Sequence, residues 1–420
     1  MQTQRSGEER PAIDGGRPAK APSPPMFPGA SLINEEEEQA VLAVVRGRRL
    51  FRFYGLGDAP SQVALLEEAF AKEVGVAHAL GVNSGTSALC TALAAAGVGP
   101  GDEVVVPAYT WVATAAAVAI LGGTPVVADI DLSLTLDPAD LARRITARTK
   151  AVIPVHMRGG AADMQPIMEF CRSRGLIVIE DVAQADGGAY RGRRLGAWGD
   201  LGCFSFQYSK ILTSGEGGMI TTPDRRLYER AVIYHDGAGT GGRKNFTEEA
   251  FLGQNYRMPE LTGAVALAQL GKLSGLLQRT RAAATAIRAG IADLGLPLRT
   301  LPDPDGDCGI CVVFFLPDAA IKDRLVTALR AENIACGGLW QPGSGDAHVY
   351  TGWQALLQRR AHHGAWAPVA APDGLAADAC PRSLDILQRA VHLDVHPFFT
   401  EADIEGTIRG VRRVVRHLLP

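Results

Sequence analysis

Two side chains near the middle of this 420-residue sequence, Asp181 and Lys210, are of types and at a spacing that could do chemistry together. Lys210 follows the apolar stretch Cys203–Phe206, which we expect to be a short buried strand, and a second strand begins near Met219. A lysine fixed between apolar strands loses solvation, which lowers its pKa and favours the neutral amine, the nucleophile that a Schiff base requires. Taken alone, however, a lysine in a polar turn is more often simply solvated.

Asp181 makes a reactive role for Lys210 the better interpretation. It ends the apolar run Leu176–Asp181, so its carboxylate is expected at the C-terminal edge of a buried parallel strand, where open α/β sheets bind ligands. A carboxylate that faces a pyridine nitrogen keeps the nitrogen protonated, and the ring can then accept electrons from a substrate carbanion. An aspartate at a strand end and a lysine 29 residues later therefore predict a pyridoxal 5′-phosphate (PLP) site with Asp181 and Lys210 as its catalytic residues.

Further motifs give the sequence a family resemblance. They are Glu180–Ala185, Phe204–Phe206 with Ser209–Lys210, Gly215–Gly218, Asn83–Thr86 and Asn255–Met258. With these motifs in the expected order, residues 35 to 418 resemble the DegT/DnrJ/EryC1/StrS aminotransferases, which aminate keto-sugars and cyclitols. The resemblance implies a PLP-dependent transferase of fold type I, like aspartate aminotransferase, with a seven-stranded, mostly parallel sheet. It also implies a homodimer with shared active sites.

Several residues around this pair are candidates for holding the cofactor. Ser84, Gly85 and Thr86 open a helix whose free amides can bind a phosphate, although in isolation they could equally be a plain helix cap. Trp111 could stack its indole on the pyridine ring, or it could be a core tryptophan. The remaining candidates are Gln184 for the ring oxygen, Ser205 for the phosphate and, by resemblance, Asn255 for the phosphate of the neighbouring subunit.

Eight residues are candidates for contacts with an amino donor or a ketone. Arg52 and Tyr54 lie in an aromatic and basic stretch that the resemblance places near the substrate, and loop packing is an equal alternative. His156 ends a strand at the ligand edge, and Arg158 departs from the tyrosine usual in the sugar-nucleotide enzymes, which could suit a different substrate. The others are Gln207 and Tyr208 beside Lys210, and His348 and Tyr350 on a later loop.

Composition excludes several classes of protein. The net charge of −3 gives no reason to expect a nucleic-acid partner. No apolar run approaches the ~20 residues of a membrane span, and the N-terminus carries no signal-peptide apolar region. Seven cysteines, an odd number, suggest a reducing cytoplasm. Cys308 and Cys311 have C-x-x-C spacing but lack a second pair or a nearby histidine, so we expect no metal site.

The chain is expected to divide into three parts. Residues 1–32 combine Pro, Gly and charge with little to bury, which predicts a disordered arm. Residues 33–296 alternate apolar strands with helices, the pattern of a parallel sheet in a large PLP-binding α/β domain, and one of these helices is expected to start within Ala108–Trp111. Residues 297–420 are expected to form a small C-terminal α+β domain.

The residues before Lys210 favour one branch of the family. Phe206-Gln207-Tyr208 resembles the glutamine-dependent cyclitol enzymes more than the sugar-nucleotide enzymes. We therefore expect a PLP-dependent aminotransferase that moves an amino group from L-glutamine, or L-glutamate, to an inosose-like keto-cyclitol in aminoglycoside-type antibiotic biosynthesis. The alternatives are a nucleotide-linked keto-sugar aminotransferase, a 3-amino-5-hydroxybenzoate synthase-like enzyme and, more distantly, a PLP-binding regulator without turnover.

Overall fold

The centre of the protein is a seven-stranded sheet with the strand order β1-β9-β8-β5-β4-β2-β3. Strand β9 runs antiparallel to both neighbours, and the other strands run parallel to one another. This confirms the mostly parallel sheet that the family resemblance implies. The strands are β1 (His78–Val82), β2 (Glu103–Pro107), β3 (Thr124–Ala128), β4 (Thr149–Val152), β5 (Ile177–Asp181), β8 (Leu201–Ser205) and β9 (Gly218–Thr222).

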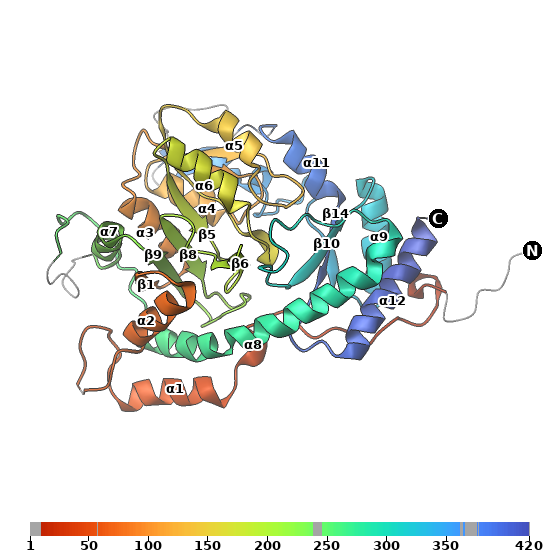
Figure 1. Ribbon diagram of the computed structural model, residues 1–420, viewed down its shortest axis with the longest axis horizontal. Coiled ribbons are helices and arrows are strands. Elements are labelled where there is room, and N and C mark those ends of the chain that lie inside the picture. Colours follow the sequence, from red (N-terminus) through yellow and green to blue (C-terminus); the bar gives the residue numbers. More distant parts are fainter. Residues whose placement is uncertain are drawn as a thin grey trace, which may run out of the picture.

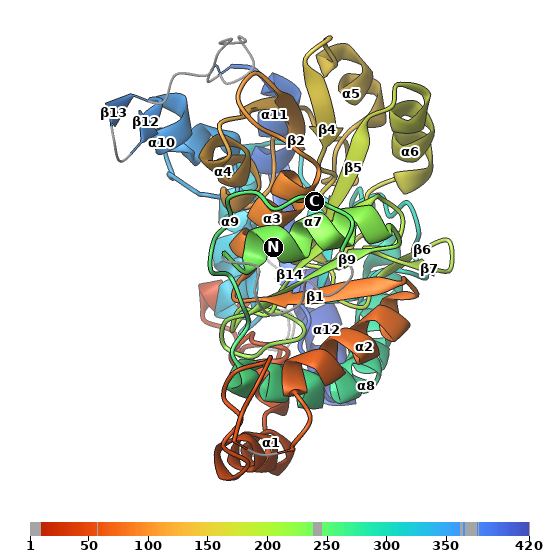
Figure 2. The same ribbon diagram turned by 90° about the vertical axis from the view of Figure 1, so that its left-hand side faces the viewer.

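The structure is a computed structural model that describes residues 10–56, 58–237, 246–361, 364–365, 376 and 378–419. Helices cover both faces of its central sheet (Figures 1 and 2). Val104 and Val106 pack into one core and Val105 into the other, because successive strand residues point to opposite faces. One face is covered by α3 (Gly85–Ala95), α4 (Ala113–Ile120) and α7 (Arg225–His235), the other by α2 (Gln62–Val74), α5 (Pro138–Arg144), α6 (Met164–Ser173) and the first half of α8 (Glu260–Ile291).

A smaller antiparallel sheet forms a third core. Its order is β10-β14-β11, and it packs with the second half of α8 (Figure 1). Helix α8 therefore contributes to this core and to one of the two cores beside the central sheet. The predicted domain boundary between residues 296 and 297 stays a prediction. The elements of this part are β10 (Cys311–Phe315), α9 (Ala319–Ala331), β11 (Cys336–Gly338), β14 (Ala390–Asp394) and α12 (Glu401–Leu418).

The remaining elements are short or peripheral. Helix α1 (Glu35–Arg46) is capped by Asn34, and Glu37 forms an ion pair of 2.7 Å with Lys272 that ties α1 to α8. The others are η1 (Ala12–Asp14), η2 (Ala30–Leu32), η3 (Met157–Gly159), β6 (Ala189–Tyr190), β7 (Arg193–Arg194), η4 (Ala292–Leu294), η5 (Tyr350–Gly352), α10 (Gln354–Leu357), β12 (Arg360–Ala361), β13 (Gly364–Ala365) and α11 (Pro381–Arg389).

The helix expected to start within Ala108–Trp111 starts later, at Ala113. The preceding residues are held in an extended loop by a distant segment of chain. Tyr109 forms a β-bridge with Val349, and the Thr110 amide donates to the His348 carbonyl over 2.8 Å. These tertiary hydrogen bonds, which local sequence cannot reveal, replace the first helical turn.

The disorder expected for the N-terminal arm is wrong for residues 10–32. The amides of Ala12 and Ala19 donate to the carboxylate of Glu332, over 2.9 and 2.8 Å. Arg409 donates to the Ala19 carbonyl over 2.6 Å, so the arm lies against α9 and α12. The arm is ordered because charged side chains of the small domain satisfy its backbone, a contribution that composition does not show. Residues 1–9 lie outside the described residues.

Among the described residues, no helix is both long and apolar enough to cross a membrane. Among the same residues, no group of three or more His, Cys, Asp or Glu side chains is arranged to hold a metal ion. Cys308 and Cys311 are buried free thiols.

Candidate active site

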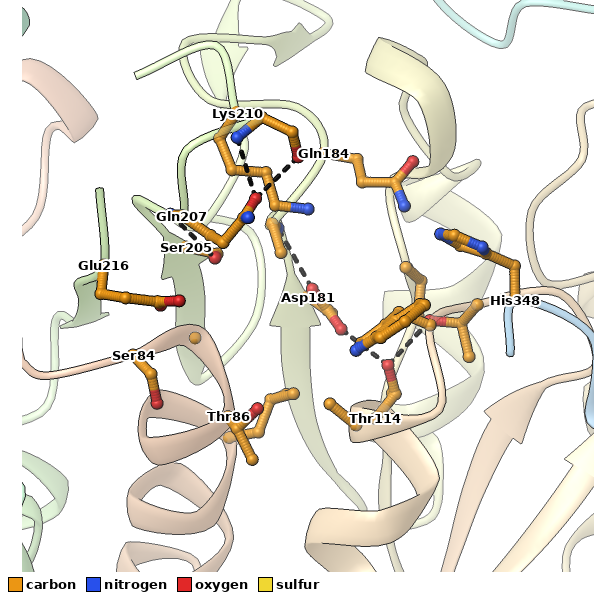
Figure 3. A pocket seen from close by; sticks show the side chains of 18 residues that line it. Ser84, Thr86, Thr114, Asp181, Gln184, Ser205, Gln207, Lys210, Glu216 and His348 are labelled. Carbon is orange, nitrogen blue, oxygen red and sulfur yellow. Dashed lines mark hydrogen bonds between the residues drawn. The ribbon is translucent and has the colours of Figure 1, made fainter. Parts of the chain in front are cut away.

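Asp181 is the fixed acid of the site. It ends β5, and its side chain is buried against the sheet edge. One carboxylate oxygen accepts from the Thr114 hydroxyl over 2.8 Å, and the other accepts from the Ala183 amide over 3.1 Å. Burial raises the pKa of Asp181, while these two hydrogen bonds and the charge of Lys210 act in the opposite direction. The carboxylate is thus held in one orientation, toward the space below Lys210 (Figure 3).

Lys210 lies in the turn between β8 and β9. Its backbone is held on both sides: the Lys210 amide donates to the Gln207 carbonyl over 2.9 Å, and its carbonyl accepts from Gly29 over 3.1 Å. Burial lowers the pKa of Lys210, against the raising influence of Asp186 and Asp181. The direction is the one expected from sequence, and it increases the share of neutral amine that can attack a carbonyl carbon.

Lys210 and Asp181 line one cavity of about 410 Å³ (Figure 3). An adjoining cavity of about 220 Å³, which contains Arg158 and Pro28, shares four lining residues with the first: Gln184, Ser209, Lys210 and His348. The structure therefore brings most of the predicted site together. The predicted residues in the larger cavity are Ser84, Gly85, Thr86, Trp111, Asp181, Gln184, Ser205, Gln207, Lys210 and His348.

The N-terminus of α3 forms a cradle at one end of the larger cavity. Ser84 caps the helix by accepting from the Ser87 amide over 3.0 Å, and the amides of Gly85 and Thr86 have no acceptor among the described residues. A side chain at position 85 would put its Cβ 2.7 Å from the Cβ of Ser205, so only glycine allows α3 and β8 to approach this closely. Free amides beside serine hydroxyls at a helix N-terminus suit a phosphate group.

Trp111 lies over the cavity instead of in the core. Its side chain is 49% exposed, which excludes the core-tryptophan alternative. Its ring centroid lies 4.9 Å from that of His348, at an interplanar angle of 60°. An exposed indole that lines the same cavity as the buried carboxylate of Asp181 is a suitable place for a flat heteroaromatic ring.

Comparison with known proteins identifies this combination of fold and site. A profile of the DegT/DnrJ/EryC1/StrS aminotransferase family matches residues 32–363. The chain belongs to this family. The resemblance inferred from the motifs is therefore confirmed, and the protein is a PLP-dependent aminotransferase.

Curated relatives of the aminotransferase act on different substrates. L-glutamine:2-deoxy-scyllo-inosose aminotransferase of Streptomyces kanamyceticus is 35% identical over 337 residues, which cover 77% of this chain and 78% of that protein. UDP-N-acetyl-3-dehydro-alpha-D-glucosamine 3-aminotransferase of Acidithiobacillus ferrooxidans is 36% identical over 361 residues, or 84% and 89% of the two chains. The match to GDP-perosamine synthase of Caulobacter vibrioides, 47% identical over 208 residues, covers 49% of this chain and 56% of that protein.

A solved structure supports the same fold. The crystal structure of 3-amino-5-hydroxybenzoic acid synthase superposes on this chain with a TM-score of 0.80 at 29% sequence identity. The match covers 95% of the aminotransferase and 100% of that chain. The PLP-dependent transferase fold expected from the sequence is thereby confirmed.

The residues present fit PLP. The α3 cradle suits its phosphate, Trp111 offers a flat face for its ring, Asp181 suits the ring nitrogen, and Lys210 suits its aldehyde carbon. When bound, PLP supplies an electron-withdrawing ring that stabilises negative charge on the carbon next to the transferred amine. Gln184 lines both cavities, and its side-chain oxygen accepts from the Arg158 amide over 3.2 Å, which leaves its NH₂ group to donate to the ring oxygen.

Two predicted substrate residues belong to the core of the aminotransferase. His156 is fully buried, with Nδ1 accepting from the Ala162 amide over 3.0 Å and Nε2 lying 3.0 Å from Glu180. Tyr350 is also fully buried, and its hydroxyl accepts from the Cys380 amide over 3.2 Å. Neither residue lines a cavity with Lys210, so the prediction that they contact substrate is not supported by their positions.

Four other predicted residues also lie away from the Lys210 cavities of their own chain. Arg52 forms an ion pair of 2.7 Å with Glu67, and Tyr54 is 73% exposed. Tyr208 is half exposed and packs on Phe27, with ring centroids 5.2 Å apart. Asn255 is exposed and forms a β-bridge with Asp236.

The structure also adds residues that the sequence analysis missed. Thr114 orients Asp181, and the hydroxyl of Thr110 lies 2.7 Å from the hydroxyl of Thr114. Glu216 lines the cavity near the α3 cradle. Thr114 could have been found from its spacing, because it stands three residues after Trp111 near the start of a helix. Glu216 lies within the recognised Gly215–Gly218 motif, but its orientation toward the cavity depends on the turn.

The hydrogen bond from Thr114 gives a testable consequence. We expect Thr114→Val to lower kcat about tenfold or more, because hydrogen bonds to charged groups contribute ~1.5–3 kcal/mol and the variant leaves a buried carboxylate oxygen of Asp181 without this donor. Thr114→Ser keeps the hydroxyl and should stay within about threefold of the wild type. Steady-state rates with saturating amino donor measure both. A wild-type rate in the valine variant would show that the bond does not orient Asp181 for the reaction.

Proposed function

We propose that this enzyme transfers an amino group from L-glutamine to an inosose-like keto-cyclitol, as expected from the sequence. The S. kanamyceticus relative, named for a glutamine:inosose aminotransferase, supports this assignment. We also propose a cytoplasmic location and a role in aminoglycoside-type antibiotic biosynthesis, both inferred from the sequence.

Lys210 and Asp181 have different roles in the proposed reaction. Lys210 would hold the cofactor at its aldehyde carbon and, as a free amine, would move a proton at the carbon that carries the transferred amine. Asp181 would keep a positive charge on the ring nitrogen, and Thr114 holds Asp181 in place. The same groups act in reverse order when the ketone is aminated.

The small number of cationic side chains in the cavity lining is the observation on which we base the proposed ketone. Apart from Lys210, Arg158 is the only lysine or arginine among the described residues that line the two joined cavities. The lining also contains the acids Asp181 and Glu216 and the neutral polar residues Gln184, Gln207 and Ser209. A diphosphate-linked sugar favours several cationic contacts, whereas a neutral polyol needs hydroxyl and amide groups. This lining favours a keto-cyclitol.

A substrate panel tests the proposal. The purified holoenzyme would be given L-glutamine with keto-cyclitols such as 2-deoxy-scyllo-inosose and scyllo-inosose, and separately with nucleotide-linked keto-sugars. We expect amination of at least one keto-cyclitol, detected as the aminocyclitol by mass spectrometry, with kcat/KM at least tenfold above that for any nucleotide-linked sugar. The reverse order would overturn the choice of ketone without affecting the aminotransferase assignment.

A nucleotide-linked keto-sugar is the second candidate substrate. It is favoured by the A. ferrooxidans relative, which is named for a UDP-linked sugar and is matched over 84% of this chain. A 3-amino-5-hydroxybenzoate synthase-like activity is a third, favoured by the structural match. The panel above separates them when it includes a carboxylated cyclic ketone.

The amino donor can be predicted from Gln207. Its side-chain oxygen accepts from the amide and hydroxyl of Ser209, over 2.9 and 2.7 Å, and its NH₂ group is therefore left to donate to a ligand. A neutral donor without a fixed positive charge suits a carboxamide better than a second carboxylate. We expect kcat/KM to be higher for L-glutamine than for L-glutamate in stopped-flow half-reactions followed by the visible absorbance of bound PLP. A clear preference for glutamate would favour the sugar-nucleotide branch instead.

We further propose a homodimer with shared active sites. Asn255 is exposed and lines neither cavity of its own chain, which is consistent with a residue that reaches the phosphate bound by a neighbouring subunit. Sedimentation of the holoenzyme tests this, because a monomer with full activity would contradict it.

A further inference from the structure

Arg158 is a cation inside the site, and the charge of Asp394 acts on it without forming an ion pair. It lines the smaller cavity together with Lys210, Gln184 and His348. Its Nε atom donates to the Tyr109 hydroxyl over 2.8 Å, and neither Nη atom has a hydrogen-bond partner among the described residues. No carboxylate within that part of the chain forms an ion pair with it.

The backbone around Arg158 is built to hold this orientation. Arg158 has φ +50°, a left-handed conformation that is uncommon for residues other than Gly, Asn and Asp. Its amide donates to the Gln184 side chain over 3.2 Å, and buried Arg299 donates to the carbonyls of Met157 over 2.8 Å and of Arg158 over 3.4 Å. A strained residue kept in place by a buried arginine indicates that the direction of its side chain matters.

A second cation, Arg299, lies beside Arg158. Arg299 places a second guanidinium next to the backbone of Arg158, and each hydrogen bond that Arg299 makes is to a carbonyl oxygen. Its pKa is lowered by burial and by the charge of Arg158. A planar guanidinium with both Nη groups free is matched in shape by the two oxygens of a carboxylate.

We propose that Arg158 binds the α-carboxylate of the amino donor. This inference rests on the proposed aminotransferase reaction but not on the identity of the ketone. In an amino acid the carboxylate and the amine are bonded to the same carbon, so a donor whose amine reacts beside Lys210 presents its carboxylate to the nearest cation of that cavity. Arg158 is that cation among the described residues. Because glutamine and glutamate share the α-carboxylate, Arg158 does not discriminate between them, and Gln207 is left to do so.

The decisive experiment removes first the guanidinium of Arg158 and then the α-carboxylate of the amino donor. The holoenzymes of the wild type and Arg158→Gln would be mixed with L-glutamine or with 4-aminobutanamide, which is glutamine without its α-carboxylate. The half-reaction is followed by the visible absorbance of PLP. We expect the wild type to prefer glutamine by about 100-fold or more in kcat/KM, and the variant to prefer it by less than about tenfold. An unchanged preference in the variant would overturn the proposal.

Equilibrium binding gives a readout that does not depend on turnover. 4-Carbamoylbutanoate is glutamine without its amine, so it cannot react, and calorimetry can measure its Kd for each holoenzyme. We expect Arg158→Gln to weaken binding about 10- to 100-fold. Arg324→Gln, which removes an exposed arginine of α9 that lines neither cavity, should leave the Kd unchanged. Equal weakening in both variants would show that only net charge matters.

Further measurements separate binding of the amino donor by Arg158 from other roles of this residue. Tyr109→Phe keeps the guanidinium but removes the one hydrogen bond that the guanidinium makes within the described residues, and should weaken binding less than Arg158→Gln does. If Arg158→Gln spares the glutamine half-reaction but prevents amination of a carboxylated ketone, then Arg158 serves the acceptor and the proposal is wrong. If no amino acid changes the absorbance of the wild type, the assignment as an aminotransferase is wrong. That result differs from one in which only the role of Arg158 is wrong.

Discussion

Lys210→Ala should abolish transamination while the protein still folds and retains PLP non-covalently. One amine both binds the cofactor and carries the proton, so the loss should reach about 10⁴-fold or more. Folding should survive because Lys210 forms no side-chain hydrogen bond or ion pair with the described residues and is only partly buried, whereas the α3 cradle and Trp111 remain to hold the cofactor.

Turnover with L-glutamine and PLP content after dialysis measure the two halves of this prediction. Lys150→Ala is a control, because Lys150 pairs with Asp102 at 3.0 Å and lines neither cavity. Near-normal turnover by Lys210→Ala, without any added amine, would disprove the role of this lysine.

Asp181→Asn should leave the fold intact and lower kcat more than about 100-fold. The amide can still accept from Thr114 and occupies the same volume, but it cannot hold a proton on the ring nitrogen by opposing charge. The effect should fall on kcat for both half-reactions, because both need the same positively charged ring. A variant with activity within about tenfold of wild type, or ~1.4 kcal/mol, would mean that Asp181 is not the nitrogen partner.

Asp186 offers a matched control. It is a second buried carboxylate close enough to influence Lys210, but neither of its oxygens has a hydrogen-bond partner in the described part of the chain, and it does not line either cavity. Burial raises its pKa well above the usual range, which favours the neutral acid that an amide resembles. We expect Asp186→Asn to keep kcat within about tenfold of the wild type. A loss equal to that of Asp181→Asn would show that the effect is not specific to Asp181 as the partner of the ring nitrogen.

The alternation of apolar strands and helices predicted the central sheet well. Strand β5 and helix α12 were predictable because their patterns are local: an apolar run that ends in acids, and an amphipathic repeat with a cap at Thr400. The late start of α4 was not predictable, since Thr110 bonds to a carbonyl more than 200 residues away in the chain. The order of the N-terminal arm likewise depends on Glu332, a buried side chain of the small domain.

For the site itself, the sequence determined the pair Asp181 and Lys210, because parallel strands bring their carboxyl ends to one edge of the sheet. Only the tertiary structure decided which neighbours join them. His156 and Arg158 are two residues apart, yet His156 is fixed in the core by Glu180 while Arg158 lines the cavity beside Lys210. The left-handed turn at Arg158 and the hydrogen bonds from Arg299 cause that difference, and they depend on segments that meet only in the folded chain.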